Sequence, residues 1–283
     1  MADWQGRVAL VSGASSGIGA AAAEALAAKG CAVTLLARRR DRLEAVADRL
    51  RLAGGRVHVV VGDVTADDDV VRAIDETLAA FGKLDIVIAN AGAGFHGSLL
   101  DTSPDAMARL LDLNYMGTFL VVQAALPHLL RAPRANVIIV SSIVGRRGLG
   151  WGSAYAATKF AQVGLAESLR VELAGTSVRV GVVFPVSTET EFREAMAREQ
   201  GFEIRGKGPR QSAGHVARAI VRGIERGRPE IYPHAASKLL QSHRIILVNR
   251  REPSNTRWRT KWHPSSPNYV RAIVEGNIRT AIS

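Results

Sequence analysis

The chain has 283 residues, of which 47% are hydrophobic and 22% are charged, so it should fold around a substantial core and is not a disordered chain. Cys31 is the single cysteine, which excludes an intrachain disulfide and argues against a thiolate metal cluster. The N-terminus lacks a signal-peptide pattern, and no apolar run approaches the roughly 20 residues of a membrane-spanning helix. We therefore expect a cytoplasmic protein without a metal site.

The formal net charge of +11 is unevenly spread along the chain. Residues 234–283 hold nine Lys and Arg but only two acids, which is +7 of that charge and leaves +4 for residues 1–233. The last clear pattern of secondary structure ends near Pro233. We therefore divide the chain into a folded domain, residues 1–233, and a basic C-terminal extension, residues 234–283.

Short β-branched runs alternate with helical patterns along the first 233 residues. We predict strands at 7–13, 31–37, 56–64, 84–92, 136–142, 178–184 and 229–233. We predict helices at 17–30, 40–53, about 65–81 with Thr65 as its cap, 104–131, about 153–173 and 212–227. Because the strands are apolar throughout and are joined by helices, the pattern predicts an α/β fold of the Rossmann type. We expect a doubly wound parallel sheet of about seven strands with helices on both faces.

A glycine-rich segment, "SGASSGIG" at 12–19, links the first strand to the first helix. Glycines let backbone N–H groups approach a pyrophosphate, and the helix N-terminus favours its negative charge. The alternative is a plain glycine-rich turn. In this strand–turn–helix context we expect a nucleotide, and the predicted contacts are Gly13, Ser15, Ser16, Gly17, Ile18 and Gly19.

The end of the second strand bears on the choice between NAD(H) and NADP(H). An NAD site usually places an acid there to bind the ribose 2′-hydroxyl, whereas this chain has Ala37 followed by Arg38, Arg39 and Arg40. A guanidinium can bind a 2′-phosphate by charge-assisted hydrogen bonds. The alternative is a solvated, basic start of a helix. We favour NADP(H) as the cofactor, with Arg38 as its main contact.

Two further clusters follow predicted strands. Asp63 and Val64 come after the third strand, where they form either a contact to the adenine or a simple entry to the next helix. "ANAG" at 89–92 comes after the fourth strand, and its small residues allow a cofactor to lie against the backbone. Asn90 could brace that turn with side-chain hydrogen bonds. We therefore add Asn90, Ala91 and Gly92 to the predicted cofactor contacts.

Tyr155 and Lys159 lie four positions apart in "GWGSAYAATKF", so they face the same side of a helix. Alone, this spacing is equally compatible with a surface aromatic beside a surface lysine. A free phenol, with a pKa of about 10, is poorly matched to proton transfer near neutral pH. A neighbouring positive charge favours the phenolate and lowers that pKa.

Taken together, the motifs resemble the short-chain dehydrogenase/reductase family in its main single-domain branch. The match covers residues 7 to about 190 in order and spacing: "SGASSGIG", "DV" at 63–64, "ANAG", Asn114 in "LDLNYMG", Ser142 in "IIVSSIVG", Tyr155 with Lys159, and "FPVSTET". Two positions depart from the family pattern. Ser12 stands where threonine is usual, and Val186 follows Pro185 where glycine is usual.

The resemblance implies a catalytic set of Asn114, Ser142, Tyr155 and Lys159. Tyr155 would be the general acid or base, and Ser142 would hold the substrate oxygen. Lys159 would bind the nicotinamide ribose, and Asn114 would interrupt the long helix and hold a water that connects Lys159 to solvent. Pro185 and Thr190 would contact the nicotinamide side of the cofactor, which carries the hydride chemistry.

This set predicts an oxidoreductase that transfers a hydride between NADP(H) and a carbonyl or secondary alcohol substrate. The choice of substrate should be determined by residues that carry no recognisable pattern: Phe95, His96, 143–151 and 187–210. By analogy with the family we expect a homodimer or homotetramer built on the helices at 104–131 and 153–173.

Two alternatives remain at this stage. One is a non-catalytic NADP(H) sensor, which would be expected to lack part of the Ser142, Tyr155 and Lys159 set. The other is a platform docked to membrane or nucleic acid through "RWRTKWHP" at 257–264, where basic residues alternate with tryptophans. For this extension we favour a solvated or loosely packed segment, or one that clasps a partner subunit.

Overall fold

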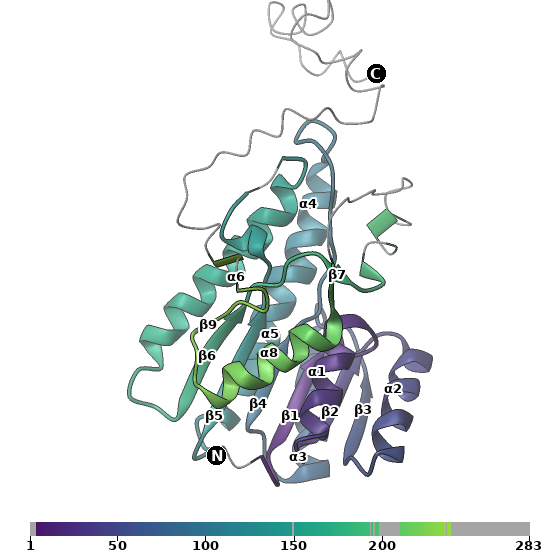
Figure 1. Cartoon of the computed structure of the whole chain (residues 1–283), viewed down its shortest axis with the longest axis vertical. Coiled ribbons are helices and arrows are strands. Elements are labelled where there is room, and N and C mark those ends of the chain that lie inside the picture. The colour runs from purple at the N-terminus through teal and green to yellow at the C-terminus, as the bar shows by residue number, and fades with distance from the viewer. Residues whose placement is uncertain are drawn as a thin grey trace, which may run out of the picture. The chain divides into compact units, whose positions relative to one another are not determined.

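The computed structural model describes residues 4–148, 150–192, 194, 196–197, 210–235 and 237–238. Within them, seven strands form one parallel sheet in the order β3-β2-β1-β4-β5-β6-β9 (Figure 1). The strands are β1 (Val8–Ser12), β2 (Ala32–Ala37), β3 (Val57–Val61), β4 (Ile86–Ala89), β5 (Ala135–Val140), β6 (Val178–Val183) and β9 (Glu230–Ile231). Each lies within a predicted strand except β5, which begins one residue before the predicted 136–142, so the predicted fold is confirmed.

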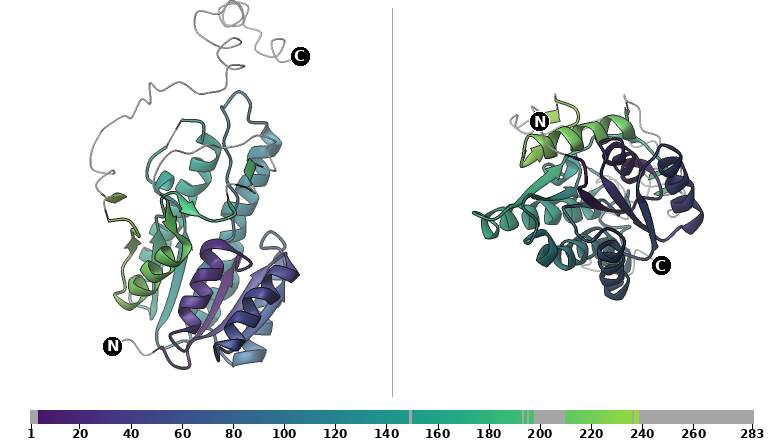
Figure 2. Two further views of the ribbon diagram at one scale, coloured as in Figure 1. Left: turned by 45° about the vertical axis from the view of Figure 1, so that its right-hand side comes forward. Right: turned by 90° about the horizontal axis from the view of Figure 1, so that it is seen from below.

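Helices cover both faces of the sheet, as the right-hand view of Figure 2 shows from below. One layer contains α1 (Gly17–Ala27), α2 (Arg40–Leu52) and α8 (Ala213–Glu225). The other contains α3 (Asp67–Phe81), α5 (Gly117–Leu129) and α6 (Ser153–Glu172), with α4 (Pro104–Leu111) leading into α5. The strands β1, β2, β4 and β5 are buried on both sides because each layer packs its own apolar cluster against the sheet, whereas the edge strand β3 is mostly half-buried.

The predicted helix at 104–131 is broken into two. Helix α4 ends at Leu111, a π-helical turn spans Asp112–Met116, and α5 begins at Gly117. Single π-turns inside helices are uncommon and often mark functional sites. The interruption falls at Asn114, where the sequence placed it.

Thr65 does not cap α3, and that prediction was wrong. The residue before the first helical turn is Ala66. Thr65 instead turns back to Asp63, whose Oδ1 accepts its N–H at 3.0 Å and its hydroxyl at 2.9 Å. The Asp63 carboxylate, two residues earlier, is a charged acceptor for both donors of Thr65, so a local Asx-type turn forms in place of the cap.

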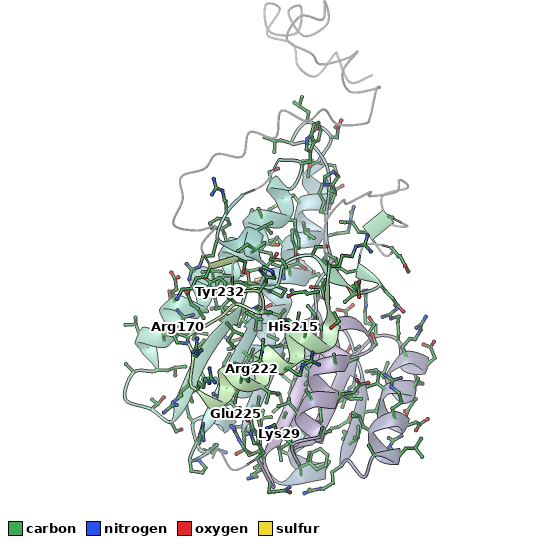
Figure 3. The ribbon with its side chains drawn as sticks, viewed as in Figure 1. Lys29, Arg170, His215, Arg222, Glu225 and Tyr232 are labelled. Atoms are coloured by element: carbon green, nitrogen blue, oxygen red, sulfur yellow. The ribbon has the colours of Figure 1, made fainter. Side chains whose placement is uncertain are left out.

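Helix α8 is fixed at both ends, and Figure 3 labels three of the side chains concerned, Lys29, His215 and Glu225. At its N-terminus Ser212 Oγ accepts the N–H of His215, and the His215 ring lies 2.8 Å from the carbonyl oxygen of Pro233. At its C-terminus Glu225 accepts from Lys29 at 3.1 Å and from the indole of Trp4 at 3.0 Å. These contacts hold α8 beside α1 and the last strand, β9.

The order of winding reverses between β1 and β4, which is where open α/β sheets bind ligands. A second, two-stranded parallel sheet lies between β6 and α8 in the chain and pairs β7 (Thr188–Glu189) with β8 (Gln211–Ser212). Among the described residues, no helix combines the length and apolar character needed to cross a membrane. Residues 239–283 lie outside the description, so the boundary at 233 and the role of the extension stay predictions.

Candidate functional site

A cavity of about 620 Å³ lies at the carboxyl ends of the strands. Its walls come from the loops after β1, β2, β3, β4, β5 and β6 and from α6. It brings together every predicted catalytic and cofactor-binding residue except Gly19 and Asn114: Gly13, Ser15, Ser16, Gly17, Ile18, Arg38, Asp63, Val64, Asn90, Ala91, Gly92, Ser142, Tyr155, Lys159, Pro185 and Thr190. Phe95 and His96, which were predicted to help set the substrate, are not among its lining residues. No cluster of three or more potential metal-ligating side chains occurs in the described part of the chain.

The glycine-rich turn is built against the end of β4. Gly13 and Gly17 have φ of 65° and 57°, a conformation that favours glycine. Gly19 lies behind the turn, where an added Cβ would come within 2.3 Å of the Gly13 carbonyl oxygen and 2.6 Å of Asn90 Nδ2. Asn90 Nδ2 donates to the carbonyl oxygens of Ser12 and Gly13 at 3.1 and 3.3 Å. Asn90 therefore braces the turn, and Gly19 shapes the cavity from outside it.

Ser12 makes the hydrogen bonds expected of the threonine it replaces. Its Oγ accepts the N–H groups of Asn90 and Ala91 at 3.0 and 3.2 Å. These bonds join the end of β1 to the turn after β4 at the point where the winding reverses.

The arginines after β2 make two different sets of contacts. Arg38 pairs with Asp63 at 3.3 Å. Arg39 reaches over the glycine-rich turn and donates to the hydroxyls of Ser15 and Ser16 at 3.1 and 2.9 Å. Burial alone would raise the pKa of Asp63, but hydrogen bonds from Thr65 and the charge of Arg38 outweigh it and hold that pKa below its usual value.

Glu191, beyond β7, forms ion pairs with two arginines of this region. Its carboxylate lies 3.2 Å from Arg39 and 3.0 Å from Arg42. Arg38 was predicted as the main contact of the basic run, Arg39 was named only as part of that run, and Arg42 and Glu191 were not predicted. The basic run itself was visible, but its acidic partner lies about 150 residues further along the chain, and no local pattern links them.

Helix α6 approaches the end of β5 because the intervening turn is small. At Gly145 an added Cβ would lie 2.7 Å from the carbonyl oxygen of Lys159, and Ser141 Oγ donates to that same oxygen at 2.9 Å. The turn after β5 also carries Ser142, whose Oγ accepts the N–H of Val144 at 3.4 Å. This packing brings Ser142 and Lys159 to one wall of the cavity.

Tyr155 lines the cavity between Ser142 and Phe192, whose ring centre is 6.0 Å from that of Tyr155. Burial raises the pKa of Tyr155 to about 12, and a hydrogen bond with Ser142 acts in the opposite direction. Lys159 Nζ lies 5.7 Å from the centre of the same ring.

Lys159 is buried, and burial lowers the pKa of its amine to about 7. Its charge was predicted to lower the pKa of Tyr155. In this geometry burial dominates both groups and disfavours both charged forms. The amine donates to the carbonyl oxygen of Val140 at 3.1 Å and to Gln162 Oε1 at 3.0 Å.

Asn114 lies behind the cavity in the π-turn and is fully buried. Its Oδ1 accepts the N–H of Ala93 at 2.8 Å, and its Nδ2 donates to the Ala93 carbonyl oxygen and to Thr158 Oγ1, each at 3.0 Å. Its main-chain oxygen accepts from Gln162 Nε2 at 2.7 Å. The link from Lys159 to Asn114 in this structure therefore runs through Gln162, which the sequence analysis missed although it is a polar residue on the buried face of α6.

The loop after β6 closes the cavity on the side of Ser142. The Pro185 carbonyl oxygen accepts the N–H of Ile143 at 3.0 Å, and an added Cβ at Gly17 would lie 3.0 Å from Thr190 Cγ2. Among the described non-glycine residues, Trp151 is the one with positive φ, so Val186 occupies its position without entering the left-handed region. Its main-chain oxygen accepts from Thr188 Oγ1 at 2.8 Å.

Comparison with known proteins agrees with this fold. The family model for short chain dehydrogenase matches residues 7–201. The protein called 11-beta-hydroxysteroid dehydrogenase-like 3 from Arabidopsis thaliana is 37% identical over 230 residues, which cover 80% of this chain and 72% of that protein.

Solved structures give the same result. A short-chain dehydrogenase/reductase from Burkholderia phymatum, in complex with NAD, matches 85% of this chain and 93% of its own, with 28% identity and a TM-score of 0.78. A short-chain dehydrogenase from Burkholderia cenocepacia, in complex with NADP, matches 82% and 97%, with 30% identity and a TM-score of 0.72. The chain belongs to the short-chain dehydrogenase/reductase family of oxidoreductases, and the predicted resemblance is confirmed.

Proposed function

We propose that this protein is an NADP(H)-dependent oxidoreductase that transfers a hydride between its cofactor and a carbonyl or secondary alcohol substrate. The observation that carries the proposal is the convergence of Ser142, Tyr155 and Lys159 on one wall of a cavity whose other end is the glycine-rich turn. All three residues are present together, which argues against a non-catalytic sensor.

The residues present fit a nicotinamide dinucleotide. The turn from Gly13 to Gly19 opens α1 without an acidic residue in its first turn, so backbone N–H groups and the helix N-terminus suit a pyrophosphate. Asp63 and Val64 would contact the adenine, and Asn90, Ala91, Gly92, Pro185 and Thr190 would line the path to the nicotinamide. Solved relatives hold NAD in one case and NADP in another, which supports this class of cofactor.

We infer a preference for NADP(H) from the cations at the adenine end. Arg38 follows β2 where an acid would be expected for NAD(H), and Arg39 is held over the glycine-rich turn by Ser15 and Ser16. Arg38 and Arg39 together would bind the 2′-phosphate by charge-assisted hydrogen bonds.

Proton transfer falls to Tyr155 in this proposal, and the bound nicotinamide supplies or accepts the hydride. Since the pKa of Tyr155 is about 12, the phenol is protonated near neutral pH and can act as the general acid of carbonyl reduction. Ser142, hydrogen-bonded to Tyr155, would hold the substrate oxygen and stabilise charge that develops on it. Lys159 would favour the phenolate in the reverse direction whenever its amine is charged.

The substrate side of the cavity is largely apolar. Its lining residues beyond Tyr155 include Ile143, Val144, Val186, Phe192 and Met196. An apolar wall beside one hydroxyl and one phenol suits a medium-sized ketone, aldehyde or secondary alcohol.

A homodimer or homotetramer is the proposed assembly. Leu111 and Met116, at the break between α4 and α5, and Phe160 and Val171 on α6 are large hydrophobic residues that are between 37% and 77% exposed. Large apolar side chains exposed on helices are typical of surfaces that a second subunit covers.

The test is a screen of NADPH and NADH consumption over a panel of carbonyl compounds, with Tyr155→Phe as the control. We expect turnover with NADPH that Tyr155→Phe abolishes. Activity that survives in Tyr155→Phe would contradict the proposed mechanism, and a preference for NADH would contradict the roles given to Arg38 and Arg39.

A further inference from the structure

Lys159 is connected to the broken helix by one side chain, that of Gln162. Gln162 lies one turn beyond Lys159 on α6 and is fully buried. Its Oε1 accepts from Lys159 Nζ at 3.0 Å. Its Nε2 donates to the main-chain oxygen of Asn114 at 2.7 Å and to Thr118 Oγ1 at 2.7 Å. These bonds tie α6 to the π-turn and to the start of α5.

The orientation of the Gln162 amide is determined by these partners. The main-chain oxygen of Asn114 can only accept a hydrogen bond, so the amide nitrogen must face it. Thr118 gives its single hydroxyl proton to the same oxygen at 2.7 Å, and its Oγ1 is therefore an acceptor toward Gln162. The amide oxygen is left facing Lys159, where it can accept from the amine.

The amine of Lys159 has few other sources of electrostatic support. Among the described titratable groups Tyr155 faces it, with 5.7 Å between the amine and the ring centre. From β5 it receives a main-chain oxygen, that of Val140. The buried side chain of the π-turn is the amide of Asn114, and the acid of that turn, Asp112, is exposed. Asp63 and Glu191, which also line the cavity, are paired with arginines. Burial is the sole cause found for the lowered pKa of Lys159.

We propose that Gln162 is a positioning residue that holds Lys159 in place and favours its ammonium form beside Tyr155. An ammonium has three donors. Val140 and Gln162 take two of them, which leaves the third for the cavity that Lys159 lines. The proposal rests on the function proposed above and deepens it, because it explains how a buried lysine can carry charge at the moment Tyr155 needs it.

The first measurement follows Lys159 itself in the free protein. Lysine carbons next to the ε-amine are isotopically labelled, the signal of Lys159 is assigned by its absence in Lys159→Met, and its pKa is read from a pH titration by NMR. Gln162→Met keeps the size of the side chain but removes both polar groups. A hydrogen bond from the ammonium to Gln162 stabilises the charged form of Lys159. Its loss should therefore lower the pKa of Lys159 by about 1 unit in this variant.

Gln162→Glu should shift the same pKa in the opposite direction. A carboxylate in contact with the amine favours the ammonium and raises its pKa. Shifts of opposite sign from two substitutions at one position are not expected if Gln162 only fills space. If Gln162→Met does not fold, Gln162→Glu is the test by itself. The proposal is overturned if the pKa of Lys159 is unchanged in every variant that folds.

The second measurement is the pH profile of alcohol oxidation, where Tyr155 must lose its proton. Gln162→Met should move the rising limb of kcat to higher pH by about 1 unit and lower kcat about tenfold near neutral pH, with a smaller change in substrate KM. Thr77→Val is the matched control. It removes a buried hydroxyl that bonds Thr34 and the Ala73 carbonyl oxygen away from the cavity, and it should leave the profile unchanged.

The outcomes separate the two proposals. If Tyr155→Phe retains activity, the proposed function fails, and the lysine titration still tests the contact with Gln162. If Tyr155→Phe is inactive but Gln162→Met matches the wild type in both titration and profile, the role of Gln162 is refuted and the proposed function stands.

Discussion

The two ends of the cavity are built from different kinds of interaction. At the Tyr155 end, Lys159, Asn114 and Gln162 are 4%, 0% and 0% exposed and are joined by hydrogen bonds. At the arginine end, the side chains of Arg38, Arg39 and Glu191 are 68%, 45% and 34% exposed, and the contacts are ion pairs, Arg38 with Asp63 and Arg39 with Glu191. Buried hydrogen bonds are costly to break, whereas exposed ion pairs contribute little and are screened by salt. We therefore expect substitutions at the first end to change the chemistry and those at the second to adjust cofactor choice.

The largest effect in this comparison is expected for Ser142→Ala. Loss of a single group that stabilises a developing oxyanion typically lowers kcat by about 100- to 1,000-fold. The fold should survive, because the hydroxyl accepts just one weak backbone bond, from Val144. Steady-state kinetics with NADPH would show this loss in kcat, and a full-rate variant would remove Ser142 from the proposed set.

Gly19→Ala should be the next most severe change. The added methyl group would meet the Gly13 carbonyl oxygen at 2.3 Å, and backbone atoms cannot move aside without displacing the turn. We expect NADPH affinity to fall by about 10- to 100-fold, since misplaced contacts of this kind cost about 1–3 kcal/mol.

Gly214→Ala is the matched control for Gly19→Ala. Gly214 lies in the first turn of α8, and its added methyl group would meet one atom within 4 Å, the flexible end of Arg218 at 3.4 Å. Calorimetric titration with NADPH should distinguish the two variants. Equal binding by both would mean that the glycine-rich turn does not contact the cofactor.

The fold was predictable because its signals are local. The apolar runs that became β1 to β6 are each bounded by turn residues, and the ordered motifs placed Asn90, Ser142, Tyr155 and Lys159 at the ends of elements that meet in space. Asn114 was placed at the helix break by resemblance, and the break is a π-turn.

The errors and omissions arose where a side chain chooses a distant or competing partner. Thr65 has the chemistry of a helix cap, but the Asp63 carboxylate binds it instead. Gln162 meets Asn114 across 48 positions, and Glu191 meets Arg39 across 152. Sequence spacing contains no information about such contacts until the sheet order brings the loops together.

Lys159→Met tests the buried end through stability. The pKa of Lys159 is lowered from 10.5 to about 7, so between these values the unfolded chain binds more protons than the folded one. Wild-type stability should therefore rise with pH from about 7 to about 10 relative to Lys159→Met, by up to about 1.4 kcal/mol per pH unit. Above pH 10 the raised pKa of Tyr155 acts in the opposite direction in both proteins.

Urea unfolding of both proteins at several pH values measures the difference directly. Other titrating groups cancel when the two are compared at each pH. A difference that stays constant from pH 7 to pH 10 would show that Lys159 is charged and unperturbed in the folded protein.

At the exposed end, Arg39→Ala should weaken NADPH binding by about tenfold, with little change for NADH. The loss should shrink as salt is added, because the side chain is accessible to solvent. Arg49→Ala removes an equally exposed arginine of α2, one that pairs with Glu24 away from the cavity, and should change neither affinity. An equal loss with both cofactors would assign Arg39 to the pyrophosphate loop and not to the 2′-phosphate.

Glu191→Gln should produce the smallest change in NADPH affinity, and it should raise that affinity where Arg39→Ala lowers it. The carboxylate of Glu191 holds Arg39 and Arg42, so it repels a 2′-phosphate and competes with it for Arg39. Its removal should strengthen NADPH binding by up to about fivefold, the range of an exposed ion pair, and should leave NADH binding unchanged. The gain should vanish in the Arg39→Ala background, because the competition acts through that guanidinium. A gain that persists there would place the repulsion at Arg42 or in the cavity at large, and weaker NADPH binding would mean that Glu191 positions Arg39 for the phosphate and does not compete with it.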